Sequence, residues 1–132
     1  MATLIPDAER NYLADQEAAR ITHLSLHEGS PGVTGANEAA GGSPAYARKA
    51  VTFNAAGAVG PLGASAQPAT VGVAWSSEVT FDVDAATYSH WGAWSAASAG
   101  TFRQGNVLSS SQSPTGQAQI KLSIGVGPFA GA

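Results

Sequence analysis

The chain is 132 residues long, 11% of its residues are charged, and its formal net charge is −3. This length fits one domain with a hydrophobic core of its own. No basic cluster exceeds the pair Arg48 and Lys49, so nucleic-acid binding is not expected, and the absence of cysteine excludes disulfides, thiolate zinc sites and cysteine nucleophiles.

The first twenty residues form the one segment that is predicted to be helical. Asp7 and Glu9 lie near its start and Arg20 lies at its end, the order that the helix dipole favours. Pro6 suits a position in the first turn. The predicted apolar stripe consists of Ile5, Ala8, Tyr12, Leu13 and Ala19. A helix this short is marginal alone, so it must dock on its own domain or on a neighbouring subunit.

This N-terminal segment lacks the basic start and apolar core of a secretory signal. No apolar run in the chain approaches the roughly 20 residues that span a bilayer, so no membrane contact is expected. We therefore expect synthesis in the cytoplasm, or export inside a larger particle. The low charge suits a surface that is largely covered in an assembly. A GC-rich genome, which enriches Ala and Gly, explains the composition equally well.

The segment Ile21–Phe53 is the most informative stretch. A strand-like opening leads into more than twenty residues dominated by Gly, Ala, Ser, Pro and Asn, before a short β-prone run. Long ordered loops are uncommon in compact domains and are usually functional or disordered. The charged residues in this segment are Glu28, Glu38, Arg48 and Lys49. We interpret it as a long ordered loop that lies against a partner.

After Arg20 the sequence predicts β-structure throughout. The expected strands are Ile21–His27, Ala50–Phe53, Val71–Trp75, Val79–Val83, Tyr88–Ser95, Thr101–Leu108 and Gln117–Val126. In the last of these, apolar residues alternate with polar ones, which predicts one buried face and one polar face. The predicted fold is an all-β antiparallel sandwich, jelly-roll-like or Ig-like. It divides into an N-terminal helix or arm (residues 1–20) and a single sandwich domain (residues 21–132).

No set of residues predicts catalysis, a metal or a cofactor. His23 and His27 share one face of a strand but stand about 13 Å apart, too far for one ion. No Gly-x-Ser-x-Gly elbow exposes a serine nucleophile, and no phosphate loop is present. Asp82 and Asp84 share a face at ~7 Å, within the range for glycoside hydrolysis, but such pairs usually serve solvation or a turn. We predict that the protein is not an enzyme and needs no cofactor.

Trp75, Tyr88, Trp91 and Trp94 form the main concentration of aromatic residues. Trp91 and Trp94 are three residues apart and therefore point to opposite faces of a strand. We predict that one lies in the core and the other on a surface or interface. Exposed aromatic residues on a sheet stack on sugars or anchor protein interfaces.

Two blocks of sequence resemble a known family. The first consists of THLSLH (residues 22–27), PG at 31–32, TG at 34–35 with Glu38, and GGSPAYARK (residues 41–49); the second consists of SHWGAWS (residues 89–95) and GTF (residues 100–102). Both resemble small virion proteins of tailed phages of actinobacteria and relatives, usually labelled tail fibre proteins or uncharacterised structural proteins. Trp91 and Ala93 depart from the pattern, which has aliphatic residues there.

The resemblance implies a structural protein of the virion, assembled in the host cytoplasm. A chain of this length without repeats does not form a shaft, so the favoured role is capsid decoration or a minor capsid protein that binds and stabilises the head. The alternative is a tail fibre or receptor-binding protein that recognises a host glycan. Expected partners are the major capsid protein or tail proteins and further copies of the chain, with a trimer as one option. The interface candidates are Tyr12, Leu13, Tyr46, Arg48, Lys49, Trp91 and Trp94.

Overall fold

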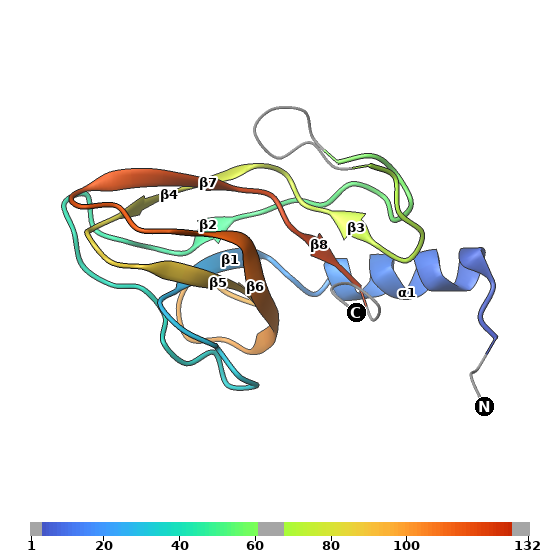
Figure 1. Ribbon diagram of the computed structural model, residues 1–132. Coiled ribbons are helices and arrows are strands. Elements are labelled where there is room, and N and C mark those ends of the chain that lie inside the picture. Colours follow the sequence, from blue (N-terminus) through green and yellow to red (C-terminus); the bar gives the residue numbers. More distant parts are fainter. Residues whose placement is uncertain (1–3, 61–67, 128–132) are drawn as a thin grey trace. The chain divides into compact units, whose positions relative to one another are not determined.

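The computed structural model describes residues 4–60 and 68–127, which form one α-helix and eight β-strands (Figure 1). The elements are α1 (Asp7–Ala18), β1 (His23–His27), β2 (Lys49–Ala50), β3 (Ala74–Trp75), β4 (Val79–Val83), β5 (Tyr88–Trp94), β6 (Phe102–Gln112), β7 (Ala118–Leu122) and β8 (Gly125–Val126). The described strands pair in antiparallel sheets. The prediction of an all-β, sandwich-like fold with a short N-terminal helix is confirmed.

Contacts divide the chain into two compact units, each built from separate segments. The first unit takes the described parts of residues 1–20, 52–78 and 122–132, and the second takes residues 21–51 and 79–121. The division into an N-terminal arm, residues 1–20, and one sandwich domain, residues 21–132, stays a prediction. In the first unit, α1 groups with residues 52–78, which contain β3, and with the segment from residue 122 that contains β8.

The first unit packs α1 on the small sheet of β3 and β8. The helix buries Ala14 and Ala18, the two residues whose short side chains let it approach the sheet closely. A Cβ on Gly127, which follows β8, would lie 3.0 Å from the Cβ of Ala14. The predicted apolar stripe is wrong in this respect, because Tyr12 is 56% exposed and Leu13 is half-buried. The helix packs on the sheet of β3 and β8 through small side chains and not through a row of large ones.

Polar contacts complete the seat of α1 within the first unit. Asn11 Oδ1 accepts a hydrogen bond from the backbone N–H of Gly72 at 2.8 Å, and Asp15 Oδ1 accepts one from Ala56 at 2.8 Å. Pro6 is the N-cap residue, just before the helix, and its side chain makes no capping hydrogen bond. The helix is short and polar, and no described helix is long and apolar enough to cross a bilayer.

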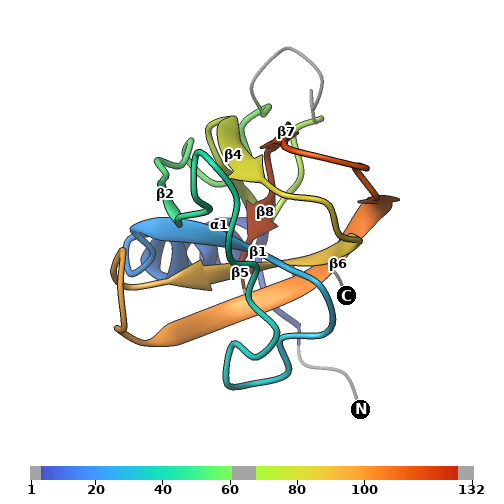
Figure 2. The same ribbon diagram turned by 90° about the vertical axis from the view of Figure 1, so that its left-hand side faces the viewer.

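The second unit contains the sheet β2-β1-β5-β6 and the strand pair β4–β7. Figure 2 shows β4 and β7 as one layer above β1, β5 and β6. Strand β4 is predicted with its exact bounds, because Val79, Phe81 and Val83 alternate with polar residues and are buried. Leu24 and Leu26 of β1 are fully buried, and Tyr46 stacks on Phe81 with ring centroids 6.1 Å apart.

The predicted strand Gln117–Val126 is broken into β7 and β8. Ser123 and Ile124, between them, are both buried, which interrupts the predicted alternation. The break is stabilised by Ser76, whose hydroxyl accepts from the backbone N–H of Ile124 at 2.9 Å, while Ser123 Oγ donates to the Ser76 carbonyl at 2.7 Å. Because β7 pairs with β4 and β8 pairs with β3, one apolar run serves two sheets.

Candidate functional site

The long loop between β1 and β2, residues 28–48, is anchored on its own unit. Its first part closes through backbone bonds from Gly35 and Ala36 to the carbonyl of Pro31, at 2.9 and 3.0 Å. The Ala39 N–H then donates to the carbonyl of Leu26 at 2.9 Å, beside a β-bridge between His27 and Glu38. The loop is therefore ordered, as predicted, and part of what it lies against is the sheet of the same chain.

The sheet face beneath this loop is shaped by glycine. The register places Ser25 opposite Gly92 and His27 opposite His90, so that these four residues share one face of β1 and β5. A Cβ on Gly92 would lie 2.6 Å from both the Ser25 hydroxyl and His27 Nε2. Only glycine leaves room there for the two polar side chains to meet.

A chain of hydrogen bonds crosses this face from a tryptophan to the loop. Trp94 Nε1–H donates to Ser25 Oγ at 2.8 Å, and Ser25 lies 2.7 Å from His27 Nε2. His27 Nδ1 lies 2.7 Å from the Ala36 carbonyl, which only accepts, so Nδ1 carries the proton. Nε2 then accepts from the Ser25 hydroxyl. Every polar atom of this buried chain has a partner when His27 is neutral.

This serine–histidine pair does not form an acyl-transfer site. Such a site needs a serine oxygen that a substrate can reach. Ser25 and His27 are both 0% exposed, and the Ser25 hydroxyl is occupied by two hydrogen bonds. The pair instead fixes the loop to the sheet, because its last acceptor, the Ala36 carbonyl, belongs to the loop.

The buried histidine should make the free energy of unfolding depend on pH. Burial lowers the pKa of His27, against opposing effects of the Ala36 hydrogen bond and Glu38, while Arg48 and His90 lower it further. The unfolded chain therefore binds a proton before the folded chain does. We expect full stability above the unfolded value of about 6.5 and a loss, at most about 1.4 kcal/mol per pH unit, as pH falls from there towards the folded pKa.

Urea unfolding of the wild type and of His27→Gln at a series of pH values checks this. Between about pH 6.5 and about pH 5, the free energy of unfolding should change less with pH in His27→Gln than in the wild type. His23→Gln changes a half-exposed histidine and should keep the wild-type dependence on pH. A wild-type stability that stays flat over this interval would contradict the assignment.

Arg48 closes the base of the loop in what we call the clamp: Glu38, Tyr46, Arg48 and Trp94. The guanidinium donates to both carboxylate oxygens of Glu38 at 2.9 Å, from Nε and Nη2. Its Nη1 donates to the carbonyls of Ala96 and Ala99, at 3.2 and 2.8 Å, in the turn between β5 and β6. Its Cζ stands 3.5 Å from the centroid of the Trp94 ring. One side chain thus joins the loop, the sheet and the turn.

The acid and the phenol of the clamp are held in fixed protonation states. Burial acts to raise the pKa of Glu38, but hydrogen bonds from Arg48 and Tyr46 outweigh it and leave that pKa below its usual value. Burial raises the pKa of Tyr46 well above its usual range, so it stays a phenol that donates to Glu38 at 2.9 Å. The Tyr46 oxygen in turn accepts from the Leu26 N–H at 3.1 Å. Glu38 is an anion at neutral pH.

The structure corrects one prediction about the tryptophans. Trp91 and Trp94 are 6% and 7% exposed, so neither lies on the surface. They do point to opposite faces of β5, but both faces are covered: the loop covers the Trp94 side, where Gly35 lies against the ring. A sugar cannot stack on either ring in this fold.

The remaining interface candidates differ in how accessible they are. Tyr12 is exposed on α1 and Leu13 is half-buried. Lys49 is half-exposed and forms an ion pair with Asp82 at 3.7 Å. Tyr46 and Arg48 are engaged in the clamp. The interface role of these residues stays a prediction, and Tyr12 is the exposed one among them.

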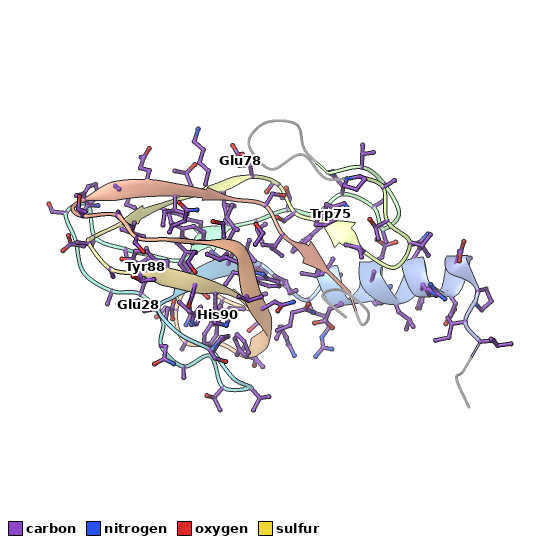
Figure 3. All side chains as sticks on the ribbon, in the orientation of Figure 1. Glu28, Trp75, Glu78, Tyr88 and His90 are labelled. Atoms are coloured by element: carbon purple, nitrogen blue, oxygen red, sulfur yellow. The ribbon has the colours of Figure 1, made fainter. Side chains whose placement is uncertain are left out.

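The acids and histidines that were candidates for catalysis or metal binding each contact different partners and do not form one site. Asp82 contacts Lys49 and Gln119, and Asp84 Oδ1 accepts from the next backbone N–H at 2.8 Å. Figure 3 shows Tyr88 and His90 on β5 with Glu28 beyond the end of β1. Within residues 4–60 and 68–127, no three His, Asp or Glu side chains are placed to hold a metal ion.

Sequence reasoning missed two exposed apolar positions in the second unit. Val33, at the tip of the loop, is 92% exposed, and Val107, in the middle of β6, is 58% exposed. The signal for Val33 was available, because it stands between Pro31-Gly32 and Thr34-Gly35, which predict a turn at the surface. The ordered base and exposed tip make the loop the candidate contact surface.

A family model described as "Podophage GP4 fiber I protein gp80" matches residues 13–126 of the chain. The match includes the loop, the clamp and every strand. Comparison with curated proteins and with solved structures gave no match.

Proposed function

Because the chain belongs to the family described as podophage GP4 fiber I protein gp80, we propose that it is a structural component of a phage fibre and not an enzyme. The observation that carries the proposal is the family match over residues 13–126. The resemblance to phage virion proteins is confirmed at the level of a phage fibre-type structural family; the actinobacterial hosts stay a prediction. The absence of an accessible nucleophile at Ser25 supports the non-enzymatic role.

A fibre role is favoured over capsid decoration. The family is described as one of fibre proteins, which favours a fibre over a capsid surface. A chain of this length without repeats does not form a fibre shaft, but a fibre also has parts other than its shaft. A short β-rich chain suits an adaptor, a collar or a tip in a fibre, where contacts matter more than length.

We propose that the loop carries the contact with the neighbouring virion protein. Its base is fixed by the clamp and by the His27 hydrogen bond, so little chain entropy remains to be lost on binding. Its tip presents Val33 without local cover. A rigid loop with one protruding apolar side chain fits a small apolar pocket on a protein partner.

Direct recognition of a glycan by an aromatic platform has less support. Among the aromatic side chains that the structure describes, Tyr12 is the one with an exposed ring, and it lies on α1. Stacking sites for sugars use accessible aromatic faces. Assembly through protein contacts is therefore the better supported form of the fibre role.

Counting and locating the protein in purified particles tests the proposal. We expect a copy number that is a small multiple of the tail symmetry, and gold-labelled antibody at the fibres. In particles of a phage that carries Val33→Asp, we expect at least a tenfold lower copy number, because a charge cannot enter an apolar pocket. Ala40→Asp, an exposed position in the same loop, is the control and should leave the copy number unchanged.

Copies in proportion to the capsomers, with label over the head, would overturn the fibre role in favour of decoration. Fibre labelling with normal incorporation of Val33→Asp would keep the fibre role and overturn the loop as its contact. The melting temperature of the isolated Val33→Asp protein should equal that of the wild type, since Val33 has almost no packing to lose.

A further inference from the structure

Strand β6 is an edge strand of the sheet in the second unit, and at its middle the backbone N–H of Val107 donates to the side chain of its neighbour, Asn106 Oδ1, at 2.8 Å, a local bond that a partner strand would replace. The strand order is β2-β1-β5-β6, so β6 pairs on one side with β5 and has no strand on its outer side within the described residues. It spans eleven residues, Phe102–Gln112. Figure 2 shows it at the outer border of the four-stranded sheet. An edge strand presents a row of unpaired N–H and C=O groups that templates further pairing.

The two edges of this sheet are built differently. β2 is two residues long, and one of the two is Lys49. Short length and positive charge are devices that block edge-to-edge pairing. β6 contains no proline, and Arg103 is its one charged residue. The sequence therefore closes one edge and leaves the other open.

The second half of β6 pairs only partly with β5. The register with β5 runs from His90 opposite Val107 directly to Tyr88 opposite Gln112. Residues 108–111 are thus passed over by the pairing, and Ser109, Ser110 and Ser111 are exposed. A polar, uncharged, extended segment with this accessibility is suited to a second strand.

The strand is self-complementary in the antiparallel direction. Val107 is the middle residue of Phe102–Gln112, and it is the exposed apolar side chain of the strand. A two-fold axis through Val107 places it opposite Val107 of the second copy. The same axis places Arg103 opposite Ser111, so no like charges face each other. About this axis the two strands pair over their full length, an apolar side chain meets an apolar side chain, and no like charges face each other.

Arg103, on the same strand, has one side-chain donor without an acceptor in the described part of its own unit. Its Nε is buried and has no hydrogen-bond partner in the part of the chain that the structure describes. A buried donor without an acceptor is unfavourable. Because this Nε is buried, a second copy reaches it only after the arginine side chain moves, so the pairing is argued from the open edge and from Val107.

We propose that two copies of the chain pair antiparallel along β6, about a two-fold axis at Val107, to form one continuous sheet. The occupant of the open edge is a second copy, because the strand complements itself. The net charge of −3 on 132 residues opposes such association only weakly. The proposal concerns the interface and holds whether or not the fibre role does.

Sedimentation equilibrium of the full chain tests this pairing. The wild type should be a dimer, and Val107→Lys should weaken dimerisation at least tenfold, because two lysines would stand directly opposite each other. Val33→Lys makes the same change at an exposed site outside β6 and should leave dimerisation unchanged. Mixing Val107→Lys with Val107→Glu should restore a dimer that neither variant forms alone.

A cysteine reporter keeps the test independent of those variants. The chain has no cysteine, so Val107→Cys introduces a single thiol. Residues directly opposite in an antiparallel pair have Cα atoms about 4.5–5.5 Å apart, within disulfide range. Oxidation at low protein concentration should link Val107→Cys chains and leave Val33→Cys chains single. A monomeric wild type, or a dimer that forms no link at Val107→Cys, overturns the proposal.

Discussion

Replacing Trp94 by alanine should lower the free energy of unfolding by about 4 kcal/mol, the range for deletion of a large buried aromatic side chain. The ring is 7% exposed and packs edge-to-face on Phe102, with centroids 5.2 Å apart. Arg48 covers it and Gly35 lies against it. The substitution also removes the donor to Ser25 Oγ. Denaturant unfolding followed by circular dichroism measures the loss, and the melting temperature should fall by about 10–20 °C.

Trp94→Phe separates packing from hydrogen bonding in this prediction. It keeps most of the ring and loses the indole N–H to Ser25, so it should cost about 1–2 kcal/mol. A stability of Trp94→Ala within about 1 kcal/mol of the wild type would contradict the burial of this ring. The prediction also bears on binding assays: loss of glycan binding in Trp94→Ala would report unfolding, not a lost sugar contact.

Replacing Arg48 by alanine should destabilise the protein by about 3 kcal/mol. The substitution leaves Glu38 partly buried without its bidentate partner, and removes the hydrogen bonds to Ala96 and Ala99. Removing one partner of a buried ion pair costs more than the pair itself contributes, because the other charge stays behind. The side chain of Arg48 is only 10% exposed, so solvent does not replace these contacts. Denaturant unfolding at neutral pH measures the effect.

Two controls bracket this effect. Arg48→Lys keeps the charge but not the planar fork, so it should fall between the alanine variant and the wild type. Arg20→Ala removes an exposed arginine whose contact with Glu17 is 4.0 Å long, and should cost under about 1 kcal/mol. Equal stabilities of Arg48→Ala and Arg20→Ala would contradict the clamp. Because Arg48 stacks on Trp94, the costs of the two alanine variants should not add.

Local pattern predicts the longer strands well and the two-residue strands poorly, since Ala50–Phe53 overlaps β2 at Ala50 alone and Val71–Trp75 overlaps β3 at its last two residues. Val79–Val83 alternates strictly and was predicted with its exact bounds, and Tyr88–Trp94 was predicted to within one residue. The fold class followed from seven such runs separated by turn residues. The predicted strand Gln117–Val126 failed at Ser123, since alternation does not reveal that a run changes its sheet partner. The helix, predicted over the first twenty residues, is shorter, Asp7–Ala18, because residues 4–6 and 19–20 lie outside it, and its buried face depends on Ala14 and Ala18, which have little weight in an apolar count.

The clamp was beyond sequence reasoning for a physical reason. Glu38 and Arg48 are ten residues apart, but Trp94 and the carbonyls of Ala96 and Ala99 come from the other segment of the unit, residues 79–121. Their meeting depends on the pairing of β1 with β5, which no local pattern encodes. The same holds for Trp94 itself: alternation predicts that it faces away from Trp91, but only the loop packing buries it.

The segmented make-up of the first unit has a consequence for synthesis. α1 leaves the ribosome early, whereas its sheet partner β8 at Gly125–Val126 emerges more than a hundred residues later. At about 10 residues per second, this is a wait on the order of ten seconds. A twelve-residue helix is marginal without its partner. The second unit, whose last segment ends at residue 121, is complete before β8 is made. The growing chain can therefore assemble its inner segments first and close its N-terminal helix last.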